Sequence, residues 1–353
     1  MLADNLYLHF PFCRAKCRYC ALLSRVGKSD AARRAYVASL ARQLSDYPSR
    51  GPLKTLYFGG GSPALTDLTP IFRVLDKRGL LTDDTEFTVE LHPLDVTDNL
   101  LTTLRAGGVN RISMGLEALD DVTLSHMGRG YTFDAAEIAF SKITPFFSNV
   151  GIDLIVGYPT ESSENFTRAA SVWKRLATWG LTHASVYSLI LEEKTRLAHD
   201  VAAGRLALPD DDTTLNRLAL VAEILSELGL SRYEISNYAR TGFECRHNLA
   251  VWRGEDYTGL GEGAFGREGL ERTTCDENLV VNREKVSPET DRRERTLFRL
   301  RTRDGLDTAA FPEWRETLDR FVQEGLLTTA APLIYRLTSR GTEVCDSILA
   351  ELV

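Results

Sequence analysis

The sequence predicts an α/β fold built on a largely parallel sheet. Short apolar, β-branched or aromatic runs alternate with amphipathic helical patterns as far as about residue 236, and reactive or charged residues follow these runs at their carboxyl ends. Strands that alternate with helices form βαβ units with right-handed crossovers, so their strands are parallel. Roughly six or seven such units form an open doubly wound sheet or a complete or partial β/α barrel, and in each the chemistry gathers at the carboxyl ends of the strands.

The expected strands are short runs rich in apolar, β-branched and aromatic residues, as strands of a buried parallel sheet are. In chain order they are Leu6–Phe10, Thr55–Phe58, Glu86–Leu91, Arg111–Met114, Gly151–Val156, Ala184–Leu189 and Arg232–Ile235. Amphipathic stretches lie between them. The alternation therefore continues to the end of the last run and stops there.

The expected helices show apolar residues at helical spacing. Ser29 or Asp30 can cap the first, which then carries one apolar face. That face consists of Val37, Leu40, Leu44 and Tyr47. Two further helices are expected at about 164–179 and 211–228. These helices supply the crossovers between parallel strands.

The chain divides into three parts. Residues 1–236 form the β/α part, residues 237–286 a glycine-rich covering segment expected to be irregular, and residues 287–353 a small terminal module. The module has helical patterns near 294–303 and 313–324, a short ribbon near 333–337 and a closing helix from Gly341. Helices followed by a β-ribbon resemble a winged helix. Its surface lacks a basic recognition face, so packing or contact with a partner is the expected role.

Composition places the chain among globular proteins of a reducing compartment. Six cysteines, three of them clustered, do not form a disulfide framework, and a strand that begins at Leu6 leaves no room for a signal or transit peptide. We therefore expect a cytoplasmic protein. No apolar run approaches the roughly 20 residues of a membrane span. The net charge of −7 argues against nucleic acid as a partner. An arginine-rich run, expected to be a solvated helix face, comprises Arg292, Arg293, Arg295, Arg299, Arg301 and Arg303.

Three clustered cysteines are the most specific chemical signal. Cys13, Cys17 and Cys20 are spaced by three and then two residues, directly after the first strand. An iron–sulfur cube needs four ligands, so three cysteines leave one iron open to an outside ligand. The alternatives are unrelated loop cysteines or half of a zinc site. A structural zinc site needs a fourth Cys or His nearby, and Leu22 and Ser24 do not supply it.

Other polar residues follow the later strands. The glycines of Tyr57-Phe58-Gly59-Gly60-Gly61-Ser62-Pro63 let a ligand lie against the main chain, although a glycine run is also typical of a flexible turn. Carboxylates and one arginine complete the set: Glu90, Glu117, Arg129 and Asp153. Asp153 lies within an apolar strand and needs a salt-bridge partner or a ligand. Carboxylates and a guanidinium around an open iron suit a zwitterionic amino acid joined to a nucleoside.

These features carry a family resemblance. The cysteine spacing with Tyr19 before the last cysteine, the Gly-Gly-Gly-Ser-Pro turn and the run Gly-Val-Asn-Arg-Ile-Ser-Met-Gly at 108–115 resemble radical S-adenosylmethionine (SAM) proteins. More narrowly, the chain is similar to the group that contains the oxygen-independent coproporphyrinogen III oxidase HemN and the heme chaperone HemW. The narrower resemblance rests on residues 232–240, 245–248, 257–261, 300–306 and 336–341. It covers nearly the whole chain and favours the HemW side.

The resemblance implies a partial (β/α)6-type parallel barrel with a 4Fe-4S cluster on Cys13, Cys17 and Cys20. SAM binds the open iron, and electron transfer into its sulfonium releases methionine and a 5′-deoxyadenosyl radical. By motif position, the implied SAM contacts are Tyr7, Tyr19, Gly60, Gly61, Ser62, Glu90, Glu117, Arg129 and Asp153. Implied partners are heme or a porphyrinogen, an electron donor such as flavodoxin or ferredoxin, and an unidentified heme acceptor; peripheral contact with a membrane stays open.

Departures from the group concern the heme-related residues. Leu22 replaces a further cysteine of the oxidase, and Val251 replaces a tyrosine in the run that begins His247-Asn248. Phe265 stands where the group usually has histidine, and Glu117 where it usually has glutamine. His247 is either an axial heme ligand or a structural histidine bonded to a backbone carbonyl.

Two functions from different classes follow. The first is a heme chaperone of the HemW type, favoured by the chain length, by Leu22 and by His247-Asn248. The second is a radical enzyme that acts on a porphyrinogen or another substrate, favoured by the nearly complete set of implied SAM contacts. A β/α protein with a structural metal is a third interpretation, and it predicts iron-loaded protein that does not respond to SAM.

Overall fold

A twelve-stranded sheet forms the centre of the computed structural model, which describes residues 3–49 and 51–353. The strands lie in the order β14-β13-β12-β11-β1-β4-β5-β6-β7-β8-β10-β9. Six of them are parallel neighbours and form the barrel wall: β1 (Asn5–Phe10), β4 (Thr55–Gly60), β5 (Glu86–Leu91), β6 (Arg111–Glu117), β7 (Asn149–Val156) and β8 (His183–Ser188). The predicted fold, a partial (β/α)6 barrel, is confirmed.

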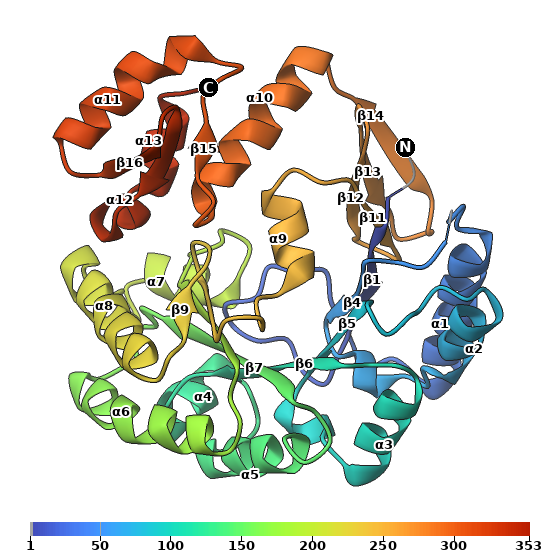
Figure 1. Ribbon diagram of the computed structural model, residues 1–353. Helices are drawn as coiled ribbons and strands as arrows, with labels where there is room; N and C mark the ends of the chain where they lie inside the picture. The colour runs from blue at the N-terminus through green and yellow to red at the C-terminus, as the bar shows by residue number, and fades with distance from the viewer. Residues whose placement is uncertain (1–2, 50) are drawn as a thin grey trace.

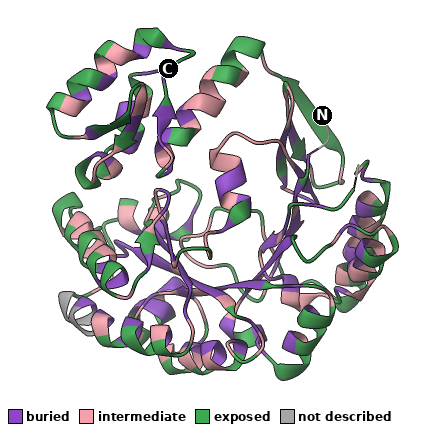
Figure 2. Ribbon diagram, viewed as in Figure 1, coloured by how far each residue is buried: buried purple, intermediate pink, exposed green. Residues whose placement is uncertain are grey.

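Helices cover the outer face of this curved sheet (Figure 1). In chain order they are α1 (Asp30–Asp46), α2 (Thr69–Lys77), α3 (Asp98–Ala106), α4 (Asp121–Met127), α5 (Phe133–Ile143), α6 (Ser163–Thr178), α7 (Arg196–Ala202) and α8 (Asp211–Glu227). Short 3-10 turns follow β4 and β5 at η1 (Pro63–Leu65) and η2 (Pro93–Asp95). Figure 2 shows largely buried strands inside helices whose outer faces are exposed. One continuous core therefore joins the barrel wall to the helices.

The first helix illustrates how the sequence sets these elements. Ser29 caps α1, its hydroxyl accepting from the backbone N–H of Ala32 at 3.3 Å. Val37, Leu40 and Leu44 are buried as the spacing predicts. Fully burying such a side chain contributes about 1.5–3 kcal/mol. The apolar face of α1 thus holds the helix on the barrel.

The last expected strand, Arg232–Ile235, is wrong in extent and direction. Only β9 (Ser231–Arg232) forms, and it pairs antiparallel with β10 (Asn237–Ala239), which in turn pairs antiparallel with β8. Tyr233 and Glu234 are buried outside the ladder. The chain turns back at this point, so the parallel βαβ pattern ends with an antiparallel hairpin.

The glycine-rich segment is regular, not irregular as expected. It contains α9 (Arg246–Trp252), β11 (Tyr257–Leu260), β12 (Phe265–Glu268), β13 (Glu271–Cys275) and β14 (Val281–Lys285). β11 pairs parallel with β1, opposite β4, in the register Leu6↔Thr258. A Cβ atom at Gly259 would lie 2.1 Å from the carbonyl oxygen of Phe265. The glycine therefore permits close strand pairing and does not signal a loose loop.

The terminal module has its own core and small sheet. Its elements are α10 (Pro288–Phe298), η3 (Arg299–Arg301), β15 (Leu306–Asp307), η4 (Pro312–Trp314), α11 (Arg315–Gln323), β16 (Leu327–Ala331), β17 (Ile334–Leu337), α12 (Ser339–Glu343) and α13 (Cys345–Ala350). Strands β15, β17 and β16 form an antiparallel sheet. The expected helices and ribbon are present, while the domain boundaries at 236 and 286 and the winged-helix resemblance stay predictions.

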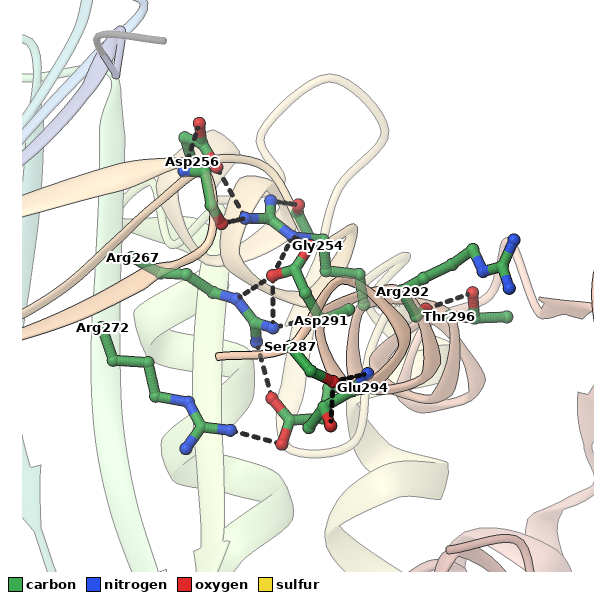
Figure 3. Close-up of polar contacts among 12 residues, drawn as sticks. Gly254, Asp256, Arg267, Arg272, Ser287, Asp291, Arg292, Glu294 and Thr296 are labelled. Carbon is green, nitrogen blue, oxygen red and sulfur yellow. Dashed lines mark hydrogen bonds and ion pairs between the residues drawn. The ribbon is translucent and has the colours of Figure 1, made fainter. Parts of the chain in front are cut away.

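Arg292, Arg299 and Arg303 of the arginine-rich run are exposed as predicted, whereas Arg295 is half-buried and joins α10 to the sheet. Figure 3 shows the contacts between α10 and the sheet around Asp291 and Glu294. The Arg295 guanidinium donates to the carboxylates of Asp291 and Asp256 and to the carbonyl of Gly269. Arg267 of β12 donates to Asp291 at 2.7 Å and pairs with Glu294 at 3.1 Å. The acidic residues that alternate with the arginines therefore face basic residues of the strands. No helix in the described part of the chain has the length and apolar character needed to cross a bilayer.

Candidate cofactor site

A cavity of about 530 Å³ opens at the carboxyl ends of the barrel strands. All three clustered cysteines line it, together with the predicted contact residues Tyr19, Gly60, Gly61, Ser62, Glu90, Glu117, Arg129 and Asp153. Tyr7 is not among the lining residues; its hydroxyl lies 3.0 Å from His9 Nδ1, and its ring stacks on Tyr57 with centroids 5.9 Å apart. The structure thus brings together every predicted site residue of the cofactor set except Tyr7.

Arginines anchor the loop that carries the cysteines. This loop runs from β2 (Phe12–Cys13) to β3 (Arg25–Val26), which pair in parallel. Arg14 Nε donates to Asp95 at 2.6 Å beside η2, and Arg25 donates two bonds of 2.7 Å to Glu262. Such bidentate arginine–carboxylate pairs fix orientation as well as position. The two ends of the cysteine loop are therefore held to the segments that follow β5 and β11.

The three thiols are free and partly exposed to the cavity. Burial raises the pKa of Cys13 to about 11 and also raises the pKa of Cys20. Arg129 Nη1 lies 3.5 Å from Cys17 Sγ, so the guanidinium contacts the cysteine loop directly. In the described residues, no three His, Cys, Asp or Glu side chains converge on a single-ion position. In an iron–sulfur cube each cysteine binds a different iron, so the three thiols need not converge on one ion.

The glycine turn at the end of β4 seats this loop. Gly60 has φ +108°, and a Cβ at Gly61 would lie 2.3 Å from the carbonyl oxygen of Phe12 and 2.9 Å from Cys13 Sγ. Only glycine allows that approach. The Ser62 hydroxyl donates to the Asp95 carboxylate at 2.5 Å, and the same carboxylate accepts a hydrogen bond from Arg14. The turn thus packs directly against the cysteine loop, as a ligand-supporting turn does and a loose turn does not.

Three carboxylates share the cavity with one guanidinium. Glu90 accepts from the Tyr57 hydroxyl at 2.8 Å and from the backbone N–H of Gly60 at 3.1 Å. Burial, then the nearby Asp153, raises the pKa of Glu90 to about 7. Burial likewise raises the pKa of Asp153 and of Glu117. This excess of carboxylates favours a ligand that brings positive charge.

Asp153, for which a salt bridge or a ligand was predicted, has a hydroxyl partner. Ser113 of the neighbouring strand β6 donates to its carboxylate at 3.1 Å. Glu117 lies 3.6 Å from Arg129 and has φ +70°, at an irregularity in the pairing of β6 with β7. A left-handed backbone at a non-glycine residue is uncommon and gathers at functional sites. The irregularity aims Glu117 into the cavity.

Sequence reasoning missed several residues of this cavity. The Tyr57 hydroxyl donates to Glu90. The only sequence feature that could have indicated this role is an aromatic residue two positions before the glycine turn. His92 follows Glu90 by two positions, and burial, then Arg129, lowers its pKa to about 3. Leu22 and Ile190 line the mouth and are 57% and 72% exposed. Their exposure could not be read from the sequence, because each lies in a loop.

His247 lies outside this cavity, near the amino ends of the strands. It is buried on α9, and its Nδ1 is 2.8 Å from the hydroxyl of Thr55, the first residue of β4. Burial lowers the pKa of His247 to about 4, so the ring is neutral. The partner is a hydroxyl group and not the backbone carbonyl expected for a structural histidine. An axial heme role stays a prediction, and it requires α9 to move.

Comparisons with known proteins agree on the family. The radical SAM superfamily model matches residues 7–171. Heme chaperone HemW of Mycobacterium tuberculosis (strain CDC 1551) is 33% identical, with 99% of this chain and 94% of the relative covered. HemW of Bacillus subtilis is 28% identical over 99% and 100% of the two chains. The solved structure of coproporphyrinogen III oxidase HemN from Escherichia coli, a radical SAM enzyme, matches with a TM-score of 0.82 at 19% identity. The match covers 99% of this chain and 89% of the HemN chain, and it shows the fold.

Proposed function

We propose that this chain, which belongs to the radical SAM superfamily and within it to the HemW family, binds heme and transfers it to an acceptor. The observation that carries the proposal is the similarity to HemW over 99% of the chain. Family membership implies a 4Fe-4S cluster and SAM. We assign both to the cavity lined by Cys13, Cys17 and Cys20.

The residues of the chain have distinct roles in this proposal. The three cysteines would hold the cluster, which when bound would supply one-electron chemistry to SAM at its open iron. Glu90 and Asp153 accept hydrogen bonds from the amino and ribose groups of SAM. Arg129, held by Tyr131 at 3.1 Å and by the carbonyl of Gly115 at 3.1 Å, faces the SAM carboxylate. Gly60 and Gly61 keep side chains out of the space that the methionine part needs.

Partners and location follow from the same chemistry. A reduced cluster needs an electron donor such as flavodoxin or ferredoxin, and a chaperone needs a heme acceptor. Unpaired thiols around a cluster suit a reducing compartment, so we place the protein in the cytoplasm. The charge of −7 makes nucleic acid a poor partner.

Hemin titration tests the function. Full-length protein, reconstituted anaerobically with iron and sulfide, is titrated with hemin, and the Soret band is recorded. A saturable shift at one heme per chain supports the proposal, and no shift contradicts it. His247→Ala, with the exposed His199→Ala as matched control, measures separately whether His247 binds the iron. A shift that weakens only in His247→Ala assigns the ligand.

A second function, that of a radical enzyme acting on a porphyrinogen, is favoured by the apolar mouth of the cavity. Leu22 and Ile190 are largely exposed where a substrate beside SAM would lie. Anaerobic incubation of the same reconstituted sample with coproporphyrinogen III, reductant and SAM distinguishes the two. Formation of protoporphyrinogen IX supports the enzyme. Slow release of 5′-deoxyadenosine alone excludes that substrate.

A further inference from the structure

The segment that carries the three cysteines and leads into α1 is strongly basic. Residues 13–34 contain seven basic residues and one acidic residue, a net charge of +6 within a chain whose total is −7. The basic residues are Arg14, Lys16, Arg18, Arg25, Lys28, Arg33 and Arg34, and the acidic one is Asp30. Positive charge is therefore concentrated around the expected cluster ligands, while the rest of the chain is acidic.

The fold leaves part of this positive charge at the surface without a counter-charge. Three of the arginines pair with carboxylates of buried residues: Arg14 with Asp95, Arg18 with Asp200 and Arg25 with Glu262. Arg33 pairs with Asp30 at 3.0 Å. Lys16, Lys28 and Arg34 are exposed, and none of them forms an ion pair among the residues that the structure describes. Since the paired carboxylates of the barrel are buried, the outer side of the segment stays basic.

Exposed apolar side chains lie between the two lysines of the segment. Leu23 and Val26 are each 43% exposed, and neither of them lines the cofactor cavity. Gly27 has φ +69°, and a Cβ atom there would have no neighbour within 4 Å. This stretch therefore presents a small apolar centre with cationic residues on both sides of it. A protein interface has a similar anatomy, in which a polar rim surrounds an apolar centre.

The same stretch lies directly beside the cysteines. In the pairing of β2 with β3, Val26 lies opposite Cys13. Lys16 precedes Cys17 in the sequence, and its ammonium group donates to the carbonyl of Leu22 at 2.6 Å. A protein that contacted Val26 from outside would therefore be separated from a cluster on the cysteines only by the thickness of this loop. Electron transfer between two proteins needs such a short separation, and the cavity side of the loop is assigned to SAM.

We infer that the outer face of the cysteine loop, formed by Lys16, Leu23, Val26 and Lys28, is the docking surface for a small acidic protein that carries one electron. The inference rests on the proposed function, which requires an electron donor for the cluster. In the docked complex one electron passes from the reduced carrier to the cluster. The carrier is thereby oxidised by one electron and the cluster reduced by one, and no bond forms or breaks.

Charge and size both suit a transient complex of this kind. Opposite charges steer the encounter of two proteins and raise their association rate. A small apolar centre suits the weak interfaces of electron-transfer complexes, which separate after each transfer. An anionic lipid surface also carries the complementary charge. The position of Val26 beside Cys13 favours the carrier, because proximity to the cluster serves electron transfer and gives a bilayer no advantage.

Flavodoxin binding to full-length protein, reconstituted anaerobically with iron and sulfide, tests the surface. Calorimetric titration at low salt measures the dissociation constant, which Lys28→Glu should raise about tenfold while weakening its dependence on salt. Lys142→Glu, exposed on α5, is the matched control and should bind like the unaltered protein. Val26→Ser should raise the dissociation constant about threefold, because it removes apolar area from the centre. Val344→Ser, 38% exposed in the terminal module, should have no effect.

The rate of cluster reduction separates docking from damage to the cluster. Photoreduced flavodoxin should reduce the cluster of Lys28→Glu about tenfold more slowly than that of the unaltered protein at low salt. Photoreduced deazaflavin, a small molecule that needs no docking surface, should reduce both at the same rate. Should Val26→Ser lose iron on reconstitution, Lys28→Glu and its salt dependence still decide.

Three outcomes overturn the docking surface. The first is flavodoxin affinity in Lys28→Glu equal to that in Lys142→Glu. The second is that neither flavodoxin nor ferredoxin, titrated in parallel, binds the unaltered protein. The third is that Lys28→Glu loses binding to phosphatidylglycerol vesicles with unchanged affinity for flavodoxin, which assigns the face to a lipid surface. Hemin titration of the same sample tests the proposed heme function separately, so failure of that function is a different result.

Discussion

Carboxylates and arginines lie at both ends of the barrel. At the carboxyl ends they line a cavity, whereas at the amino ends they contact other protein groups. At the carboxyl ends, Glu90, Glu117 and Asp153 line a cavity with Arg129. At the amino ends, Arg111 and Glu86 are also buried, but α9 covers them. Glu86 accepts from the backbone N–H groups of Arg246 and His247 at 3.0 and 3.1 Å. The hydrogen bonds of the carboxylate at the amino end are therefore satisfied by protein groups.

The difference teaches how a buried charge should be interpreted. A buried charge needs a partner, and the partner can be protein or ligand. Where helix α9 supplies backbone N–H groups to the carboxylate, as at Glu86, the charge is structural. Where a cavity adjoins it and its pKa is displaced, as at Glu90, we propose that a ligand is a further partner. Four predictions test this contrast.

The largest effect is expected for Cys17→Ser. Removing one of three thiolates should abolish the cluster, so iron content and visible absorbance after reconstitution should fall to background. The free energy of unfolding of the cluster-free protein should change by less than about 1 kcal/mol, since the thiol is partly exposed. Cys345→Ser, in the terminal module, should retain full iron. Iron retention in Cys17→Ser would contradict the cluster assignment.

Arg111→Met should show the reverse pattern at the amino end. Arg111 is 1% exposed, and its loss leaves the buried Glu86 without a nearby cation. We expect unfolding in urea to become easier by about 3 kcal/mol. Arg105→Met, on the exposed surface of α3, is the control. If Arg111→Met instead lost SAM affinity without losing stability, the amino end would not be a purely structural region.

Glu90→Gln should change how stability depends on pH. The folded pKa of Glu90, about 7, lies above its ordinary value, so the folded state binds more protons than the unfolded state between these values. Stability should therefore fall as pH rises from 5 to 8, by about 1–2 kcal/mol after allowance for water in the cavity. Glu90→Gln should remove the contribution of Glu90 to this fall, and the exposed Glu316→Gln should not. Urea midpoints of cluster-free protein at both pH values measure it.

Thr55→Val should give the smallest effect. Its hydroxyl bonds Asn5 at 3.0 Å and His247 at 2.8 Å, so the variant leaves two buried groups without a partner at nearly constant volume. We expect a loss of about 1 kcal/mol in the free energy of unfolding with unchanged iron content. Thr102→Val, exposed on α3, should be neutral. A loss of iron in Thr55→Val would contradict a purely structural role for the amino ends of the strands.

The barrel wall and most of the cofactor cavity could be predicted from the sequence. Apolar runs mark β1 and β4 to β8, and the ends of parallel strands must meet at one edge, which brings Cys13 and Asp153 together. The apolar pattern failed at β11, because its glycines serve close strand pairing and resemble a loop. Tyr7 stacks on Tyr57 and does not line the cavity, and its role as a SAM contact stays a prediction.

Partners distant in sequence set the remaining limits. The contacts of Arg295 could not be predicted because one of its acceptors, Asp256, lies on another segment. His247 could not be placed at the amino end, since neither its motif nor its spacing states which edge of the sheet α9 covers. The cavity between α8 and the terminal module likewise depends on how these two parts of the chain pack. Such contacts arise from packing between segments, which local periodicity does not encode.

The pairing of β11 with β1 has a consequence for biogenesis. One side of the first strand, beginning at Asn5, has no neighbour until the strand beginning at Tyr257 has left the ribosome. At about 5–20 residues per second, that edge stays open for on the order of ten to fifty seconds. An unpaired strand edge is a template for aggregation. The nascent chain thus carries its cysteine motif and an open edge together, which makes early protection by a folding factor valuable.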